Sequence, residues 1–245
     1  MVFNITECVD FHHGKRIVIT ILVCGHDVVI IMHKEGDALL IQQPVYYPFR
    51  EVIEDNGRIF VNNQLHYEDG KYTIDFEDFE KKIVDNNVKV FILCNPHNPV
   101  GRVWTKEELE KMGDICLKHN VVIMDDEIHC DFTYPGFKFT SFMTLDEKYH
   151  NSLVLYTSPS KTFNVAGLQP ANIIIKNPEL RAAYRKANAA AGYSQGSIMG
   201  QVAVKSVYTK GDEWVNELVE YITGNMNYMR DFVKEKLPEG SFRRS

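Results

Sequence analysis

The chain has 245 residues, and its 27 lysines and arginines against 33 aspartates and glutamates give a formal net charge of −6. A chain of this length forms one large domain, or one domain and part of a second. Hydrophobic residues at 44% and charged residues at 24% are typical of a folded globular protein and exclude a disordered chain. The acidic balance argues against general nucleic-acid binding, which needs a basic face.

The cysteines and the N-terminal segment carry no export or membrane signal. The five cysteines are odd in number and contain no CxxC pair, so we expect neither a disulfide framework nor a zinc site, and the cytoplasm is the expected compartment. Residues 17–32 are apolar, but Gly25, His26 and Asp27 interrupt them before they reach the length of a membrane span. Because no small-residue cleavage site follows, we expect two buried strands here rather than a signal peptide.

Apolar runs and helical patterns alternate along the rest of the chain. The apolar runs have the length of buried strands and lie at residues 38–42, 88–93, 121–124, 153–156 and 172–175. The helical patterns lie at residues 75–84, 105–116, from 178 onward, 195–209 and 212–236. This alternation predicts an α/β domain with a mostly parallel sheet flanked by helices. In such sheets, ligands bind beyond the carboxyl ends of the strands.

Three polar side chains follow three of these predicted strands. Asn98 comes after the first, Asp126 ends the second and Lys161 follows the third. A lysine can form a Schiff base, and a carboxylate can keep a ring nitrogen protonated. These are the two groups that a pyridoxal phosphate enzyme needs. Taken singly, a lysine is more often a surface charge, and an aspartate after a strand is more often a turn or capping residue.

Three sequence runs, in this order and spacing, resemble a known family. The runs are CNPHNPVG (residues 94–101), DEIHCD (126–131) and SPSKTFNVAGLQ (158–169). They are similar to the fold-type I pyridoxal phosphate enzymes of the class I/II aminotransferase superfamily, and most of all to its cystathionine β-lyase branch. The resemblance implies a seven-stranded, mostly parallel sheet of the aspartate aminotransferase type and pyridoxal 5'-phosphate as the cofactor.

The resemblance also implies roles for individual residues. Lys161 corresponds to the Schiff-base lysine, which is also the base that moves the substrate Cα proton. Asp126 corresponds to the partner of the pyridine nitrogen, with Asp125 as its chief rival. Asn98 would donate to the phenolic oxygen of the cofactor. His129 stands where many aminotransferases have a tyrosine, which favours the lyase branch.

The remaining implied contacts concern the cofactor ring and its phosphate. Tyr46 would stack on the ring, although a core or interface tyrosine is the alternative interpretation. Ser158 and Ser160 would hold the phosphate. Gln169 stands where family members often have a phosphate-binding arginine, so part of the phosphate charge must be met elsewhere.

The resemblance divides the chain into three parts. Residues 1–33 are an atypical N-terminal segment, residues 34–224 are the cofactor-binding large domain, and residues 225–245 begin a smaller C-terminal domain. Family members are longer, so we expect a chain truncated at both ends. The arginine that binds the substrate carboxylate belongs to the small domain and has no counterpart that can be assigned here.

The expected function follows from this branch. A carbon–sulfur β-lyase would cleave a sulfur amino acid such as cystathionine to a thiol, pyruvate and ammonia, acting as a homodimer in the cytoplasm without nucleic-acid or membrane partners. An aminotransferase is the first alternative, because it shares the early steps. A non-catalytic remnant of the family is the second alternative, because fold does not fix function.

Overall fold

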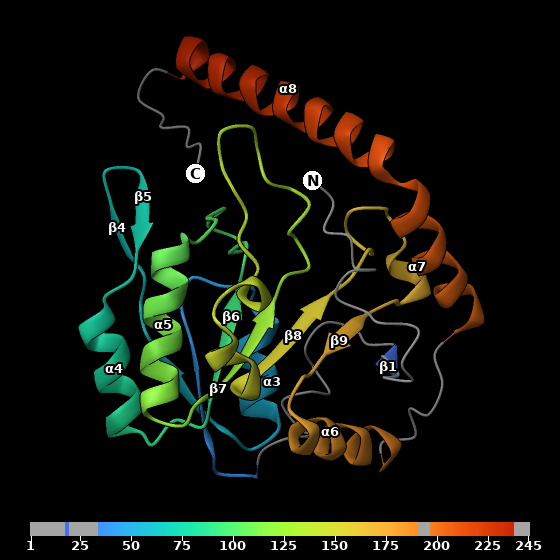
Figure 1. Ribbon diagram of the computed structural model, residues 1–245. Coiled ribbons are helices and arrows are strands. Elements are labelled where there is room, and N and C mark those ends of the chain that lie inside the picture. Colours follow the sequence, from blue (N-terminus) through green and yellow to red (C-terminus); the bar gives the residue numbers. More distant parts are fainter. Residues whose placement is uncertain (1–17, 20–33, 191–196, 238–245) are drawn as a thin grey trace.

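The computed structural model describes residues 18–19, 34–190 and 197–237 (Figure 1). Its main sheet has seven strands in the order β1-β9-β8-β7-β6-β2-β3. The five strands from β8 to β3 are parallel, whereas β9 is antiparallel to both β8 and β1. The expected seven-stranded, mostly parallel sheet is therefore confirmed. The strands are β1 (Val18–Ile19), β2 (Ala38–Ile41), β3 (Ile59–Asn62), β6 (Val90–Cys94), β7 (Val122–Asp126), β8 (Leu153–Thr157) and β9 (Asn172–Ile174).

Helices cover the sheet, and a small hairpin of β4 (His66–Glu68) and β5 (Lys71–Thr73) lies apart from it. The α-helices are α3 (Pro48–Asp55), α4 (Phe76–Asp85), α5 (Lys106–Lys118), α6 (Pro178–Ala190), α7 (Ile198–Lys210) and α8 (Asp212–Lys236). Three short 3₁₀ turns are η1 (Phe142–Thr144), η2 (Glu147–Ser152) and η3 (Ala166–Leu168). Among the described residues, no helix combines the length and the apolar character that a bilayer crossing requires.

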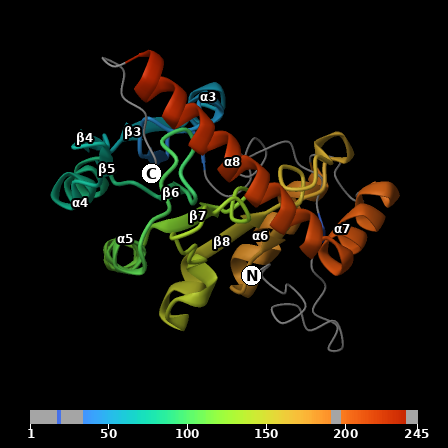
Figure 2. The ribbon, with the colours of Figure 1, turned by 90° about the horizontal axis from the view of Figure 1, so that it is seen from above.

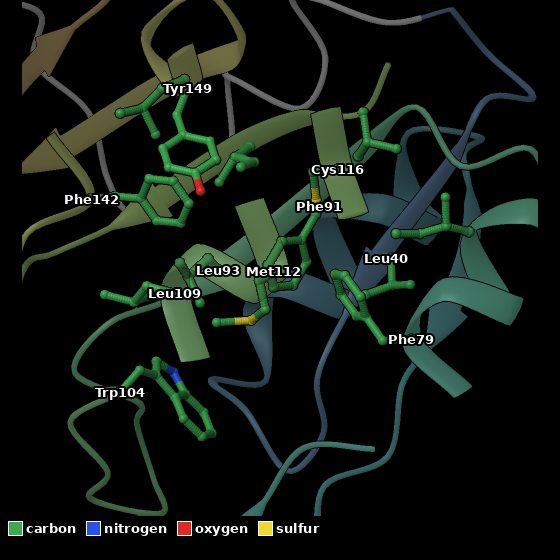
Figure 3. Packing of buried hydrophobic residues seen from close by; sticks show 14 of the residues in the cluster. Leu40, Phe79, Phe91, Leu93, Trp104, Leu109, Met112, Cys116, Phe142 and Tyr149 are labelled. Carbon is green, nitrogen blue, oxygen red and sulfur yellow. The ribbon is translucent and has the colours of Figure 1, made fainter. Parts of the chain in front are cut away.

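Each central strand contributes to two cores, because successive side chains of a strand point to opposite faces of the sheet. On one face, Phe91 of β6 meets Phe79 of α4 edge-on, with ring centroids 5.0 Å apart, and Met112 of α5 joins the same cluster (Figure 3). On the other face, Ile92 of β6 belongs to a cluster that includes Tyr184 of α6 and side chains of α3. The fold is thus a sheet between two helical layers.

The predicted helix starts are confirmed by their caps. Asp75 accepts a hydrogen bond from the backbone N–H of Asp78 at the start of α4. Thr105 and Glu108 form a reciprocal capping box at the start of α5, which satisfies two backbone donors that the helix leaves unpaired. Asn177 caps α6 through its side-chain oxygen. These local signals fix where the covering helices begin.

Some elements have no counterpart among the sequence predictions. Strand β3 has only Val61 fully buried, so it lacks the continuous apolar run that marks a central strand. Helix α3 has eight residues, too few for a clear helical period. Of the two strands expected within residues 17–32, only β1 lies in the described part of the chain. The expected domain boundary after residue 224 falls inside α8, and that division stays a prediction.

Helix α8 is the longest element at 25 residues. It runs across the side of the molecule at which the parallel strands end (Figures 1 and 2). Near its start, the indole N–H of Trp214 donates to the carbonyl oxygen of Thr162 at 3.1 Å. The loop after β8 is therefore attached to α8.

Candidate active site

A pocket of about 130 Å³ lies where β6, β7 and β8 end, and the loop after β2 closes another side of it. Its lining residues come from segments far apart in the sequence: Tyr46, Cys94, Asn98, Asp126, Ile128, His129 and Lys161. Five of the seven predicted site residues therefore meet in one cavity. Parallel strands explain this meeting, because their carboxyl ends share one edge of the sheet.

Asp126 faces this pocket, whereas its neighbour Asp125 points into the opposite core. Burial raises the pKa of Asp126 to about 6, and this rise is opposed by the N–H of Ile128, 3.1 Å from Oδ1, and by the charge of Lys161. At pH 7 the carboxyl group is therefore mostly ionised. This placement favours Asp126 over Asp125 as the partner of a cationic ring, a role that stays a prediction.

Asp125 forms a fully buried carboxyl pair with Glu127. Neither side-chain oxygen of Asp125 has a hydrogen-bond partner, so its burial beside another carboxyl group favours the protonated form. Glu127 also accepts the N–H of Phe142 at 2.9 Å, so it is anchored in the core around η1. Burial and the adjacent carboxylate raise the pKa of Asp125 well above its usual range. This pair lies outside the pocket. We therefore expect a substitution in it to change folding stability and not catalysis.

Asp125→Asn is expected to stabilise the protein at alkaline pH. The folded chain keeps a proton on Asp125 that the unfolded chain releases above about pH 4, so wild-type stability falls as pH rises from there toward the folded-state pKa. An asparagine amide does not titrate in this range, so the variant does not lose stability in this way as the pH rises. Urea unfolding at pH 5 and pH 8 should show a gain of about 1–3 kcal/mol that is larger at pH 8. An equal gain at both pH values would contradict a proton held by Asp125.

Lys161 reaches the pocket from a tightly turned loop, although its side chain is exposed overall. The N–H of Phe163 donates to the carbonyl oxygen of Pro159, four residues earlier, at 2.9 Å. Next to the lysine, the Thr162 hydroxyl donates to Asp131 at 2.8 Å, and its carbonyl accepts the indole N–H of Trp214. Two flanking segments therefore hold the backbone that presents Lys161.

The predicted phosphate ligands occupy a different place. Ser158 is buried, and its hydroxyl donates to the carbonyl oxygen of Pro170 while accepting the N–H of Ser160 at 3.0 Å. The single hydroxyl proton of Ser158 is therefore already donated within the loop and is not available to a phosphate oxygen. Neither serine is among the residues that line the pocket, and Gln169 is an exposed residue with a left-handed backbone at the end of η3. Their role in phosphate binding stays a prediction.

Two pocket residues were not predicted from the sequence, Cys94 and Ile128. Cys94 ends β6 in register with Asp126, so both side chains emerge on the same face. Its Sγ accepts the N–H of Asn98 at 3.4 Å, and burial raises the pKa of the thiol, which stays protonated. Its place as the last residue of the buried apolar run, directly before the turn that carries Asn98, could have identified it. His129 is half-buried, and burial together with Lys161 lowers its pKa, so the ring is neutral at pH 7.

Comparison with known proteins agrees with this geometry. Residues 24–242 match the family model described as aminotransferase class I and II. The chain belongs to the class I and II aminotransferase family. Cystathionine β-lyase PatB of Bacillus subtilis is 43% identical over 204 residues, which are 83% of this chain and 53% of that protein. Protein MalY of Escherichia coli is 32% identical over 83% of this chain and 52% of its own length.

Solved structures of this family share the fold. Cystalysin from Treponema denticola, whose crystal structure contains a pyridoxal 5'-phosphate cofactor, superposes with a TM-score of 0.88 at 37% identity, over 93% of this chain and 59% of that chain. A cofactor-bound C–S lyase from Staphylococcus hominis gives a TM-score of 0.82 at 32% identity, over 98% and 61%. The chain spans about half the length of the curated class I and II relatives it matches.

Proposed function

We propose that this protein is a pyridoxal phosphate-dependent carbon–sulfur β-lyase. One observation carries the proposal: Lys161 and Asp126, from the ends of different strands, line the same small pocket. The relatives named as cystathionine β-lyase and C–S lyase support the reaction class.

The side chains of the pocket fit the cofactor chemically. The pocket is lined by an amine that can bond to an aldehyde and by a carboxylate that can hold a protonated ring nitrogen. It is also lined by an aromatic face and an amide donor. The neutral imidazole of His129 adds a hydrogen-bonding group beside Lys161. The phosphate needs further donors, because the Ser158 hydroxyl is committed to Pro170.

Each of these residues has a distinct proposed task. Asp126 would accept the pyridine N–H, Asn98 would donate to the phenolic oxygen, and Tyr46 would cover the ring, an aromatic contact worth about 0.5–1.5 kcal/mol beyond its burial. When bound, the cofactor draws electrons away from the substrate Cα. Nζ of Lys161 would hold the cofactor through its aldehyde and would act as the base for the substrate Cα proton.

The substrate, assembly and compartment complete the proposal. A sulfur amino acid such as cystathionine would be cleaved with water to a thiol, pyruvate and ammonia. A homodimer is proposed because sites of this family are completed across a two-fold interface. The cytoplasm is the proposed compartment, which agrees with the free thiols of Cys94, Cys116 and Cys130 in the described part of the chain.

Product analysis with cystathionine tests the reaction class. The purified protein, incubated with pyridoxal phosphate and cystathionine in the absence of any keto acid, is expected to release pyruvate and homocysteine in equal amounts. An aminotransferase would instead require an added keto acid and would release no thiol. A chain that forms neither product at saturating cofactor would support the non-catalytic remnant.

A further inference from the structure

A buried histidine joins two of the loops that line the pocket. His97 precedes Asn98 in the turn after β6, and its ring is 2% exposed. Its Nε2 lies 3.0 Å from the carbonyl oxygen of Pro44, two residues before Tyr46. A carbonyl oxygen only accepts, so Nε2 must carry a proton. Burial lowers the pKa of His97 to about 4, so the neutral ring makes this hydrogen bond throughout the neutral range.

The other side of the ring is held by a buried cluster. The indole of Trp104 packs edge-on against His97, with ring centroids 5.3 Å apart, and its Nε1–H donates to the carbonyl oxygen of Cys94 at 3.0 Å. The guanidinium of Arg102 lies 4.5 Å from the Trp104 ring centre and pairs with Glu108 at 2.7 Å. Glu108 belongs to the capping box of α5. The ring is therefore fixed to the sheet and to a helix.

The backbone of His97 is fixed as well. Its N–H donates to the carbonyl oxygen of Arg102 at 2.7 Å, and its own carbonyl accepts the N–H of Gly101 at 2.8 Å. This closed turn contains Asn98. Because this turn is held in place, the hydrogen bond from His97 to Pro44 also fixes the position of the loop that carries Tyr46.

We propose that His97 is a positioning residue that fixes the separation between Tyr46 and Asn98. Without the imidazole, the carbonyl of Pro44 loses its buried donor, and the two loops can move independently. A cofactor that contacts both Tyr46 and Asn98 would be sensitive to such movement, because its binding would then have to order the two loops. The cofactor part of this inference rests on the proposed function, whereas the link between the loops does not.

Hydrogen exchange of the cofactor-free full chain tests the link directly. In His97→Leu, peptides covering residues 43–49 and 95–102 should both exchange about tenfold faster, the equivalent of one lost hydrogen bond. His97→Gln places an amide N–H near the position of Nε2 and should restore both loops to within about threefold of wild type. If residues 43–49 keep wild-type exchange in His97→Leu, the link does not exist.

The control uses a second buried histidine of the same kind. Nε2 of His150 lies 3.1 Å from the carbonyl oxygen of Met143, on the side of the sheet covered by α5. His150→Leu should leave both pocket loops unchanged, although it loses a comparable hydrogen bond. If hydrogen exchange of the two pocket loops accelerates equally in both leucine variants, His97 contributes only to general stability, and the proposal is wrong.

Fluorescence titration with pyridoxal phosphate supplies the second readout. The dissociation constant should rise about tenfold in His97→Leu, recover in His97→Gln and stay unchanged in His150→Leu. An unchanged constant in His97→Leu would overturn the inference for the cofactor. If the wild-type chain binds no pyridoxal phosphate, the proposed function fails, and the exchange result alone still decides whether His97 joins the loops.

Discussion

Lys161→Ala is expected to lower kcat for pyruvate release from cystathionine by at least about 10³-fold, because the substitution removes the group that both bonds to the cofactor aldehyde and moves the Cα proton. The visible absorbance of lysine-bound cofactor should disappear in the same variant. Steady-state kinetics and an absorbance spectrum at saturating pyridoxal phosphate measure the two effects. The fold should persist, because the Lys161 side chain is exposed and the loop is held by its neighbours.

Two control variants separate chemistry from charge. Lys161→Arg keeps the positive charge near Asp126 but cannot form the bond, so it should be as inactive as the alanine variant. Lys81→Ala removes an exposed lysine that pairs with Asp85 on α4, a helix that contributes no lining residue to the pocket. It should retain wild-type turnover. Residual pyruvate release in Lys161→Ala near the wild-type rate would show that another group acts as the base.

The sequence predicted the meeting of the pocket residues because their positions follow from topology. Asn98, Asp126 and Lys161 each stand just beyond a buried apolar run, and parallel strands bring such positions to one edge. Adjacent residues of a strand face opposite ways, which is why Asp125 and Asp126 have different surroundings. The choice between Asp125 and Asp126 rested on the family resemblance. The apolar run at residues 121–124 does not by itself reveal which face of the strand lies toward the pocket.

Other features depend on contacts between distant residues. Ser158 stands near Lys161 in the sequence, but the direction of its hydroxyl is set by the carbonyl of Pro170, after η3. The bond from His97 to Pro44 joins residues 53 positions apart. No periodicity or capping signal encodes such a contact, because it arises only when two loops are packed against each other. Strand β3 was missed for another reason: it is an edge strand with only one fully buried residue, so its sequence lacks a continuous apolar run.

Asp126→Asn is expected to reduce kcat by about 10²–10³-fold, the size of effect seen when one preorganised electrostatic group is removed from an active site. The amide cannot keep a ring nitrogen protonated, although it is nearly the same size as the carboxylate. Asp125→Asn is the matched control, because it changes the adjacent residue on the opposite face of β7. Kinetics on both variants should show the loss only at 126. A comparable loss of kcat in Asp125→Asn would contradict the assignment of the pairing role to Asp126.

The pH dependence of cofactor affinity provides an independent test of Asp126. Its pKa of about 6 in the cofactor-free chain means that it gains a proton, and loses its charge, as pH falls below that value. The affinity for pyridoxal phosphate should then weaken by up to about tenfold for each pH unit below 6. The phosphate of the cofactor titrates in the same range, so the informative quantity is the difference in slope between wild type and Asp126→Asn. Titrations from pH 5 to 8 that give identical slopes for the two proteins would mean that this carboxylate does not face the bound ring.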